Sequence, residues 1–395
     1  MRQLLLVVLM LTAVILNTSV SANYAHPKDA PMKYILIHGF ISETIRDKVS
    51  DSSTLKLFSR HYWHQYWYHK ADAHLYWDSG KRLAQNRANL LEQLNQVFLD
   101  GTCRDGCMFV THSTGDLVLR DLLEQWRLKY LETYLRPEPE WEWLSHILAF
   151  RNTSMRIYGS IDIAGAGGGS ELAEAAIKTV KDYHDSSRFT RWLLRTTDPK
   201  TKAILNTYQR VPTLSEMGIL HDLVPAVARS TAIGNSAIPR LRVVGGGRFD
   251  NNSGLLGFLT SELLEQTLPG LDDGVIAAHS ACGALQRAAY NSCFRDVKPN
   301  GLLYQDEISP ASFFDKHFPV LMGDSYDHSD LLDGEGHGKI TTDLLREGRD
   351  FDFYLRMEKP ALRFVQSGGE LFAWVENSDH IHISDVLINQ LRKKN

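Results

Sequence analysis

Short apolar runs alternate with amphipathic stretches along this chain. The runs have the length of buried strands, and most of them end at glycine or polar residues; they cover 34–37, 108–110, 155–163, 241–244 and 318–322. Between them, apolar residues recur at helical spacing, in 81–99, 117–130 and 171–180. This alternation predicts an α/β fold, with a mostly parallel sheet covered by helices on both faces. The ligand site of such a sheet lies beyond the carboxyl ends of its strands, so the residues that follow each strand are candidates for function.

The first residues have the pattern of an export signal. Arg2 precedes an apolar run, Leu4 to Leu16, that is too short to span a bilayer comfortably, and Val20-Ser21-Ala22 offers small residues for cleavage. We therefore expect a signal peptide over residues 1–22 and a secreted or periplasmic mature chain that forms one domain over 23–395. An uncleaved anchor is the alternative.

The chain has four cysteines, Cys103, Cys107, Cys282 and Cys293. Cysteines of an exported protein tend to pair, and three pairings are possible. The simplest joins neighbours, Cys103 to Cys107 and Cys282 to Cys293. No second Cys or His pair stands near Cys103 and Cys107, which disfavours zinc.

The charge composition bears on which classes of molecule the protein binds. The 43 basic and 47 acidic residues give a formal charge of −4 at pH 7. A balance so close to neutral gives no reason to expect nucleic acid as a partner.

The strongest chemical signal surrounds Ser113. A buried strand runs directly into Thr111-His112-Ser113-Thr114-Gly115, and a helix follows at once. This is the setting of a nucleophile elbow, whose usual pattern is G-x-S-x-G. Thr111 stands where that pattern has its first glycine. We expect Ser113 to be a nucleophile and the Thr114 amide to be one donor of an oxyanion hole; a simple helix cap is the alternative.

A second signal is His38-Gly39-Phe40, which follows the first buried strand. An amide from the loop after an early strand completes the oxyanion hole of α/β-hydrolases. We expect that amide to belong to Phe40, with His38 bracing the loop.

These segments resemble those of the secreted bacterial triacylglycerol lipases, of the α/β-hydrolase superfamily. The likeness rests on Leu-Ile-His-Gly-Phe at 36–40, Val-Thr-His-Ser-Thr-Gly at 110–115, Gly-Ala-Gly-Gly-Gly-Ser-Glu-Leu-Ala at 165–173, Asp-Asp-Gly-Val-Ile at 272–276 and Asp-His-Ser-Asp at 327–330. Ala166 and Gly167 depart from the family's Pro-His. The resemblance implies that Asp273 is the catalytic acid, that His328 is the base and that Asp330 is a ligand of a structural calcium ion. No cofactor is expected for the chemistry itself.

Other residues compete for the same roles. His380 and His382, and less well His337, also come late enough in the chain to be the base. Asp272, Asp222 and Asp250 are alternatives for the acid, and carboxylates beside a catalytic histidine are frequent without any metal.

The resulting hypothesis is hydrolysis of carboxylic esters, of lipid type, by a lipase or carboxylesterase. Phospholipase or thioesterase activity on the same fold is one alternative, and a binding protein without catalysis is another. We expect a lid or cap over residues 174–235, where lipases keep a lid, and the aromatic stretch 61–77 either lines an acyl pocket or packs on the sheet.

Overall fold

The fold is taken from a computed structural model of the whole chain. The structure describes residues 33–47, 51–63, 71–104, 107–135, 157–231, 240–244, 272–281, 302–303, 318–322, 327–328, 341–347, 352–358, 362–367 and 370–375. The expected signal peptide therefore lies outside the described residues.

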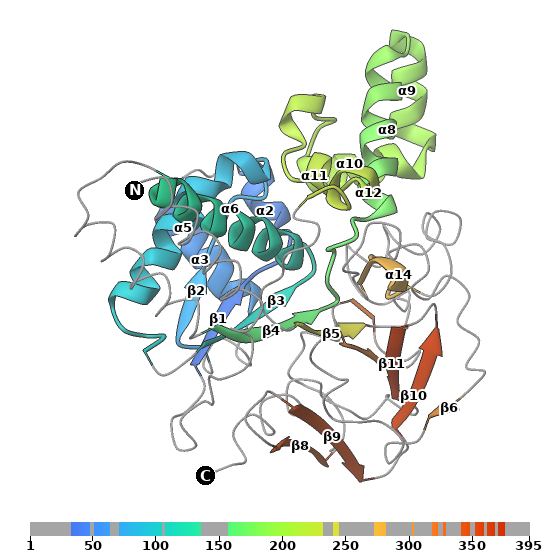
Figure 1. Cartoon of the computed structure of the whole chain (residues 1–395). Helices are drawn as coiled ribbons and strands as arrows, with labels where there is room; N and C mark the ends of the chain where they lie inside the picture. The colour runs from blue at the N-terminus through green and yellow to red at the C-terminus, as the bar shows by residue number, and fades with distance from the viewer. Residues whose placement is uncertain are drawn as a thin grey trace, which may run out of the picture.

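A nine-stranded sheet, in the order β2-β1-β3-β4-β5-β7-β11-β10-β6, organises the described part of the chain (Figure 1). Neighbours from β2 through β11 pair in parallel, and at one edge β10 pairs in antiparallel fashion with both β11 and β6. The strands are β1 (Lys33–Ile37), β2 (Ala73–Leu75), β3 (Cys107–His112), β4 (Ile157–Ile163), β5 (Arg240–Val244), β6 (Leu302–Leu303), β7 (Phe318–Met322), β10 (Leu362–Ser367) and β11 (Glu370–Val375). The predicted mostly parallel sheet is confirmed.

The helices occupy the connections between these strands. They are α2 (Ser42–Arg46), α3 (Ser52–Tyr62), α5 (Leu83–Leu99), α6 (Gly115–Leu135), α8 (Glu171–Asp185), α9 (Arg188–Thr197), α10 (Pro199–Tyr208), the 3-10 turn η2 (Leu214–Glu216), α11 (Leu220–Leu223), α12 (Pro225–Ala228) and α14 (Ala278–Ala281). The sequence patterns at 81–99, 117–130 and 171–180 correspond to α5, α6 and α8.

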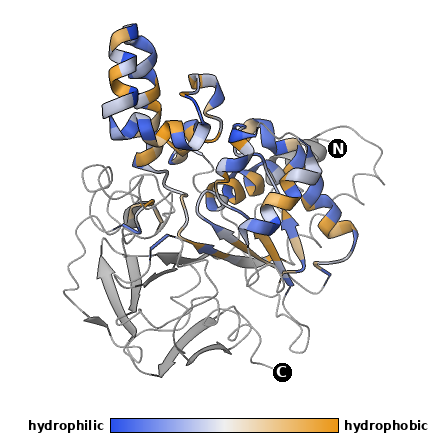
Figure 2. Cartoon of the chain, turned by 180° about the vertical axis from the view of Figure 1, so that it is seen from behind, coloured by the Kyte–Doolittle hydropathy of each residue, from blue (hydrophilic) through white to orange (hydrophobic). Residues whose placement is uncertain are grey.

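The core forms where β1 and β3 lie side by side beneath α5 and α6. Every residue of β3 is buried, as are four of the five residues of β1, so both strands are covered on both faces. Leu90 and Leu94 of α5 and Leu117 and Leu122 of α6 belong to the same buried cluster. Figure 2 shows hydrophobic residues concentrated on these strands. This rigid half of the sheet carries the turn that contains Ser113.

The chain after residue 328 contributes two antiparallel hairpins. One forms a separate two-stranded sheet from β8 (Thr341–Glu347) and β9 (Asp352–Glu358). The other joins β10 to β11, with Leu362 opposite Val375. Unexpectedly, β11 also pairs in parallel with β7, with Ala373 opposite Val320, and so becomes part of the main sheet.

Helices α8 to α12 lie between β4 and β5, in the region where a lid was expected. Ser170 caps α8 by accepting a hydrogen bond from the Leu172 amide, and Ser187 caps α9 in the same way through Thr190. Helices α8 and α9 project together from the body of the protein (Figure 1). They are held by a small apolar cluster around Val180 and Tyr183.

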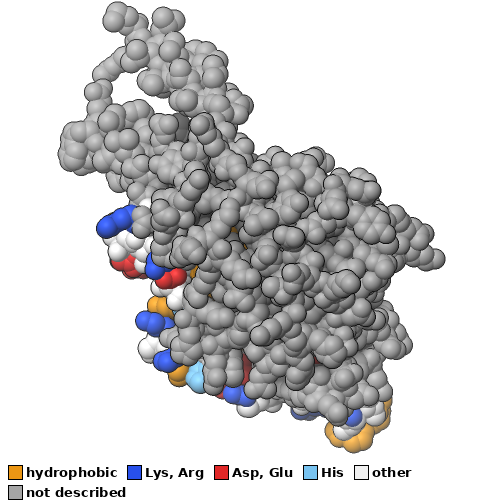
Figure 3. All heavy atoms as spheres, turned by 90° about the horizontal axis from the view of Figure 1, so that it is seen from below, with side chains coloured by type: hydrophobic (Ala, Val, Ile, Leu, Met, Phe, Trp, Pro, Cys, Tyr) orange, Lys and Arg blue, Asp and Glu red, His pale blue; other side chains and the backbone are white. Residues whose placement is uncertain are grey.

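A disulfide joins Cys103 to Cys107, as predicted, and connects the end of the α5 segment to the first residue of β3. Cys282 and Cys293 lie outside the described residues. None of the helices that the structure describes is both long and apolar enough to cross a membrane. The described side chains visible in Figure 3 mix basic and acidic residues, in keeping with the near-neutral composition.

Candidate active site

Ser113 lies in a sharp turn between β3 and α6. Its φ is 52°, in the left-handed region that non-glycine residues rarely adopt. Main-chain hydrogen bonds fix the turn: the Ser113 amide donates to the Ile163 carbonyl at 3.0 Å, and the Ser113 carbonyl accepts from the Ala166 amide at 2.8 Å. A strained serine between a buried strand and a helix N-terminus has the geometry of a nucleophile elbow.

The turn requires small residues around it. A Cβ atom on Gly115 would lie 2.9 Å from the His38 carbonyl oxygen, and one on Gly39 would lie 2.8 Å from the Ser113 Cβ. Both glycines thus let the loop after β1 approach the Ser113 turn. The loop that contains Phe40 and the turn that contains Ser113 are therefore neighbours.

Thr111, the departure from the usual elbow pattern, has a defined role in the fold. Its Oγ1 donates a hydrogen bond of 2.7 Å to Oδ1 of Asp162, a fully buried carboxylate on β4. The other oxygen of Asp162 accepts from the Ser160 hydroxyl at 3.1 Å. The threonine therefore ties the nucleophile strand to its neighbour.

The two amides expected to form an oxyanion hole are both without an acceptor among the described residues. Neither the Phe40 N–H nor the Thr114 N–H donates a hydrogen bond within the part of the chain that the structure describes. Thr114 directly follows Ser113, and Phe40 directly follows Gly39, which packs against Ser113. These two donors remain available to a ligand.

His38 braces the Phe40 loop from inside. Its Nδ1 lies 2.7 Å from the Gly39 carbonyl oxygen, its Nε2 accepts from the Trp77 amide at 3.2 Å, and its ring stacks on the Trp77 indole. Burial lowers the pKa of His38 to about 4, so the ring is neutral. A neutral ring suits these contacts, because one nitrogen donates and the other accepts.

Asp273 and His328 are brought together although they are 55 positions apart. His328 Nδ1 lies 2.8 Å from Asp273 Oδ2, and the His328 amide donates to the Asp273 carbonyl, also at 2.8 Å. Both side chains are buried. A carboxylate on Nδ1 holds a histidine ring in the tautomer that leaves Nε2 free to accept a proton.

The rest of the acidic loop is organised around that pair. The second oxygen of Asp273 accepts from the amides of Val275 and Ile276, at 3.0 and 2.7 Å. Asp272 instead accepts from the Gly274 amide at 2.9 Å and shapes the turn.

Among the competing candidates for the acid and the base, the structure describes Asp272 and Asp222. Both carboxylate oxygens of Asp222 accept hydrogen bonds from the Arg82 guanidinium, so Asp222 has a structural role. Asp250, His337, His380 and His382 lie outside the described residues.

His112 is a functional candidate that the sequence analysis did not single out. Its Nε2 lies 3.0 Å from the main-chain oxygen of His328, and the two rings are 4.6 Å apart. Its Nδ1 is hydrogen-bonded to the hydroxyl of Tyr62 on α3. Burial, and then the proximity of His328, lower the pKa of His112 well below its ordinary value. The segment that contains His328 therefore rests on the residue that directly precedes Ser113.

The glycine-rich segment after β4 accommodates the first turn of α6. A Cβ on Gly165 or Gly167 would lie 3.1 Å from the carboxyl carbon of Asp116, which is fully buried. The Gly167 carbonyl accepts from the Arg120 guanidinium at 2.5 Å. Gly167, where the resembling family has histidine, thus serves the packing of α6 in this chain.

Asp330, the expected calcium ligand, lies outside the described residues. Within the described ranges, no group of three or more His, Cys, Asp and Glu side chains could hold a metal ion. The Asp273–His328 pair is held by its own hydrogen bonds.

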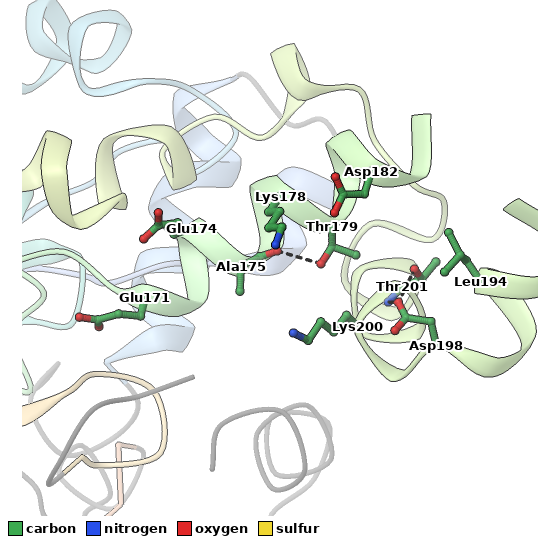
Figure 4. A pocket seen from close by; sticks show the side chains of 10 residues that line it. All are labelled: Glu171, Glu174, Ala175, Lys178, Thr179, Asp182, Leu194, Asp198, Lys200 and Thr201. Carbon is green, nitrogen blue, oxygen red and sulfur yellow. Dashed lines mark hydrogen bonds between the residues drawn. The ribbon is translucent and has the colours of Figure 1, made fainter. Parts of the chain in front are cut away.

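Residues of α8, α9 and α10 line a separate pocket (Figure 4). Its lining contains both acidic and basic side chains, among them Glu174, Lys178 and Asp182. None of the residues considered above for catalysis lines it, so it is not part of the candidate active site.

The parallel sheet and the strand–turn–helix at Ser113 define the α/β-hydrolase fold. No protein-family model and no curated protein matches the chain. Several solved structures do match at low identity. A mature lipase of Bacillus licheniformis is 14% identical, over 66% of this chain and 83% of its own, with a TM-score of 0.37. A lipase of Staphylococcus hyicus is 13% identical, over 78% and 90%, with a TM-score of 0.38.

A metagenomic carboxyl esterase is 18% identical, with a TM-score of 0.36, over 64% of this chain and 60% of its own. The chain therefore spans less than two thirds of that esterase. These likenesses are too distant to identify what this chain acts on.

Proposed function

We propose that this protein is a serine hydrolase that cleaves carboxylic esters, with Ser113 as nucleophile, His328 as base and Asp273 as the acid. The proposal is carried by one observation: a strained serine at a strand–helix turn adjoins a buried histidine–carboxylate pair. The order Ser, Asp, His along the chain agrees with the order in this fold.

The chemistry proceeds in two halves. Ser113 Oγ attacks the ester carbonyl while His328 Nε2 takes its proton, and the tetrahedral species collapses when that proton passes to the departing alcohol. Water then attacks the acyl-enzyme, gives its proton to His328 and releases the acid, and Ser113 recovers its proton. Asp273 orients the ring and stabilises the imidazolium that forms twice.

The amides of Phe40 and Thr114 would hold the oxyanion. They have no acceptor among the described residues, so no hydrogen bond there must be broken when charge develops on the substrate oxygen. Preorganised donors of this kind are worth about 3 kcal/mol each in acyl transfer.

The finer proposal, a lipid-like substrate, draws support from α9. This helix exposes Phe189, Trp192 and Leu193, with exposed fractions of 72%, 60% and 42%, and it also carries Arg188 and Arg195. No acidic residue lies within α9. A helix with aromatic and leucine side chains on one side and arginines beside them matches the surface of a lipid layer with anionic headgroups.

Fluorophosphonate labelling tests the nucleophile. We expect one label per chain, on Ser113, and none in Ser113→Ala, whose turnover should fall on the order of 10⁶-fold. A folded wild-type protein that takes no label would support the alternative of a hydrolase-like binding protein.

Substrate preference requires a separate experiment. Hydrolysis rates across p-nitrophenyl esters of increasing chain length, compared with phospholipid and thioester substrates, distinguish a lipase from an esterase, a phospholipase or a thioesterase. A rate that falls steadily with acyl length would contradict the lipid-like substrate and leave the serine chemistry intact.

Export is part of the same proposal. A secreted or periplasmic protein cleaved after Ala22 should begin at Asn23 and carry the Cys103–Cys107 disulfide. Mass spectrometry of the exported chain tests both; a chain that retains residues 1–22 would contradict the cleavage.

A further inference from the structure

We propose that Tyr62 and His112 are positioning residues that hold the His328 segment against the Ser113 turn. This inference rests on the proposed function, since it concerns the alignment of the base with the nucleophile. Neither residue is expected to touch the substrate.

The hydrogen-bond chain has only one possible arrangement of protons. The His328 carbonyl can only accept, so His112 Nε2 carries the proton of the 3.0 Å contact. His112 Nδ1 is then an acceptor, because the ring is neutral, and the Tyr62 hydroxyl must donate to it. Each link therefore determines the direction of the next.

The ionisation states agree with this arrangement. Burial raises the pKa of the Tyr62 phenol above its ordinary value, although a hydrogen bond from the Gly39 backbone acts in the opposite direction. The phenol is thus protonated and can donate. The lowered pKa of His112 keeps its ring neutral, which leaves Nδ1 free to accept.

Tyr62 also touches the loop of the other oxyanion donor. A Cβ on Gly39 would collide with the Tyr62 hydroxyl, so that hydroxyl lies against the loop that presents Phe40. Its partner His112 directly precedes Ser113 and contacts the main-chain oxygen of His328. One phenol of α3 thus connects three segments: the Phe40 loop, the Ser113 turn and the His328 segment.

The arrangement fixes His328 at three points. Its amide and its Nδ1 are bound by Asp273, and its carbonyl is bound by His112. Asp273 sets the orientation of the ring, and within the part of the chain that the structure describes, His112 ties the segment to the nucleophile turn. Removal of that tie should lower kcat, because small displacements of catalytic groups slow reaction strongly, and should leave KM unchanged.

The experiment measures kcat and KM on a short p-nitrophenyl ester for variants of both residues. Tyr62→Phe removes only the hydroxyl and should lower kcat about tenfold, the cost of one hydrogen bond. His112→Leu should lower it further. His112→Gln should recover most of the loss, since its amide can accept from Tyr62 and donate to His328.

Tyr208→Phe is the matched control. The Tyr208 hydroxyl is also buried, but it has no hydrogen-bond partner in the described part of the chain, so its loss should leave kcat unchanged. In the His112→Leu background, Tyr62→Phe should have almost no further effect, because the two residues act through one chain. Thermal unfolding confirms that each variant is folded.

Three results would overturn the inference: Tyr62→Phe with wild-type kcat, the same loss from Tyr62→Phe in both backgrounds, or an effect on KM alone. Ser113→Ala is measured alongside. If Ser113→Ala is inactive and Tyr62→Phe is fully active, the positioning role fails and the proposed function stands. If Ser113→Ala remains active, the proposed function itself fails.

Discussion

Asp273 binds His328 twice, through a carboxylate contact of 2.8 Å to Nδ1 and through a main-chain hydrogen bond of the same length. The other carboxylate oxygen accepts two amides of its own loop. An asparagine at 273 could keep those loop contacts through its amide oxygen, but it would present an amide nitrogen to the histidine. One oxygen of Asp273 thus holds the loop, and the other orients the His328 ring.

We expect Asp273→Asn to lower kcat about 10⁴-fold with little loss of stability, because the wrong tautomer of His328 is favoured. Steady-state kinetics and thermal unfolding measure the two effects. Asp272→Asn is the control: its oxygen can still accept from Gly274, so its kcat should stay close to that of the wild type. Equal losses in both variants would contradict the assignment of the acid.

His328→Ala should be as inactive as Ser113→Ala, whereas His380→Ala and His382→Ala should retain activity. The reason is the Asp273 contact, which gives His328 an acid partner. The rates of ester hydrolysis by the three variants show which histidine is the base. A single inactive variant at 380 or 382 would transfer the role of base to the segment after β11.

Thr111→Val should destabilise the fold by about 1–3 kcal/mol, because a buried oxygen of Asp162 loses a donor. Urea unfolding measures the change. Thr179→Val is the comparison. Among the described residues, the Thr179 hydroxyl donates to the Ala175 carbonyl of its own helix, so this variant should cost less than about 0.5 kcal/mol. If both variants were equally stable, the Thr111–Asp162 contact would have no net stabilising effect.

Stability should fall as the pH drops below 6.5. Burial lowers the pKa of His38 to about 4 in the folded state, and it lowers the pKa of His112 well below its ordinary value of 6.5. Between the lowered pKa and 6.5, each histidine binds a proton in the unfolded chain and not in the folded one. Each histidine contributes a slope of about 1.4 kcal/mol per pH unit within its window. His112→Gln removes one titrating group, so its urea-derived stability should depend less steeply on pH; an unchanged slope would show that His112 does not stay neutral in the folded protein.

Helix α9 should bind anionic vesicles. In the Ser113→Ala background, which prevents hydrolysis, we expect tighter binding to phosphatidylcholine–phosphatidylglycerol vesicles than to phosphatidylcholine alone. Arg188→Gln and Arg195→Gln should each weaken binding about fivefold, and Trp192→Ser should weaken it on both kinds of vesicle.

Leu99→Ser is the control for this surface, because Leu99 is 78% exposed but belongs to α5. Its vesicle binding should match that of the parent protein. Binding that is unaffected by the α9 changes would exclude this helix as the lipid-contacting surface. Self-association that disappears with Trp192→Ser would assign the apolar side to a second copy instead.

Local pattern and chain order were sufficient to predict the Ser113 turn and the parallel sheet. The Asp273–His328 pair came from short motifs, and the structure brings the two residues together. Tyr62 and His112 were not found, because their contact joins positions fifty residues apart and no periodicity marks it. The available signal was a histidine at the end of a strand that the sequence already indicated to be buried.

The sequence of residues 362–375 indicates a hairpin, but it does not show where that hairpin lies in the sheet. Alternation identifies a strand and gives no information on which strand lies beside it. The same limit applies to the glycines of 165–169, which follow a predicted strand and were therefore candidates for function. Their packing against Asp116 depends on where α6 lies relative to the segment after β4, which the pattern of either segment does not show.

The parallel pairing of β7 with β11 has a consequence for how the protein is made. The sheet grows across the molecule nearly in the order of synthesis, from β3 through β4, β5 and β7 to β11. While the chain emerges, the last strand to have paired presents an open edge, and such edges bind other chains. The edge of β7 is covered only when residues 370–375 have been synthesised. A nascent chain that depends on so late a strand stays incompletely folded for most of its synthesis, and chaperones that cover the open edge should therefore raise the yield of folded protein.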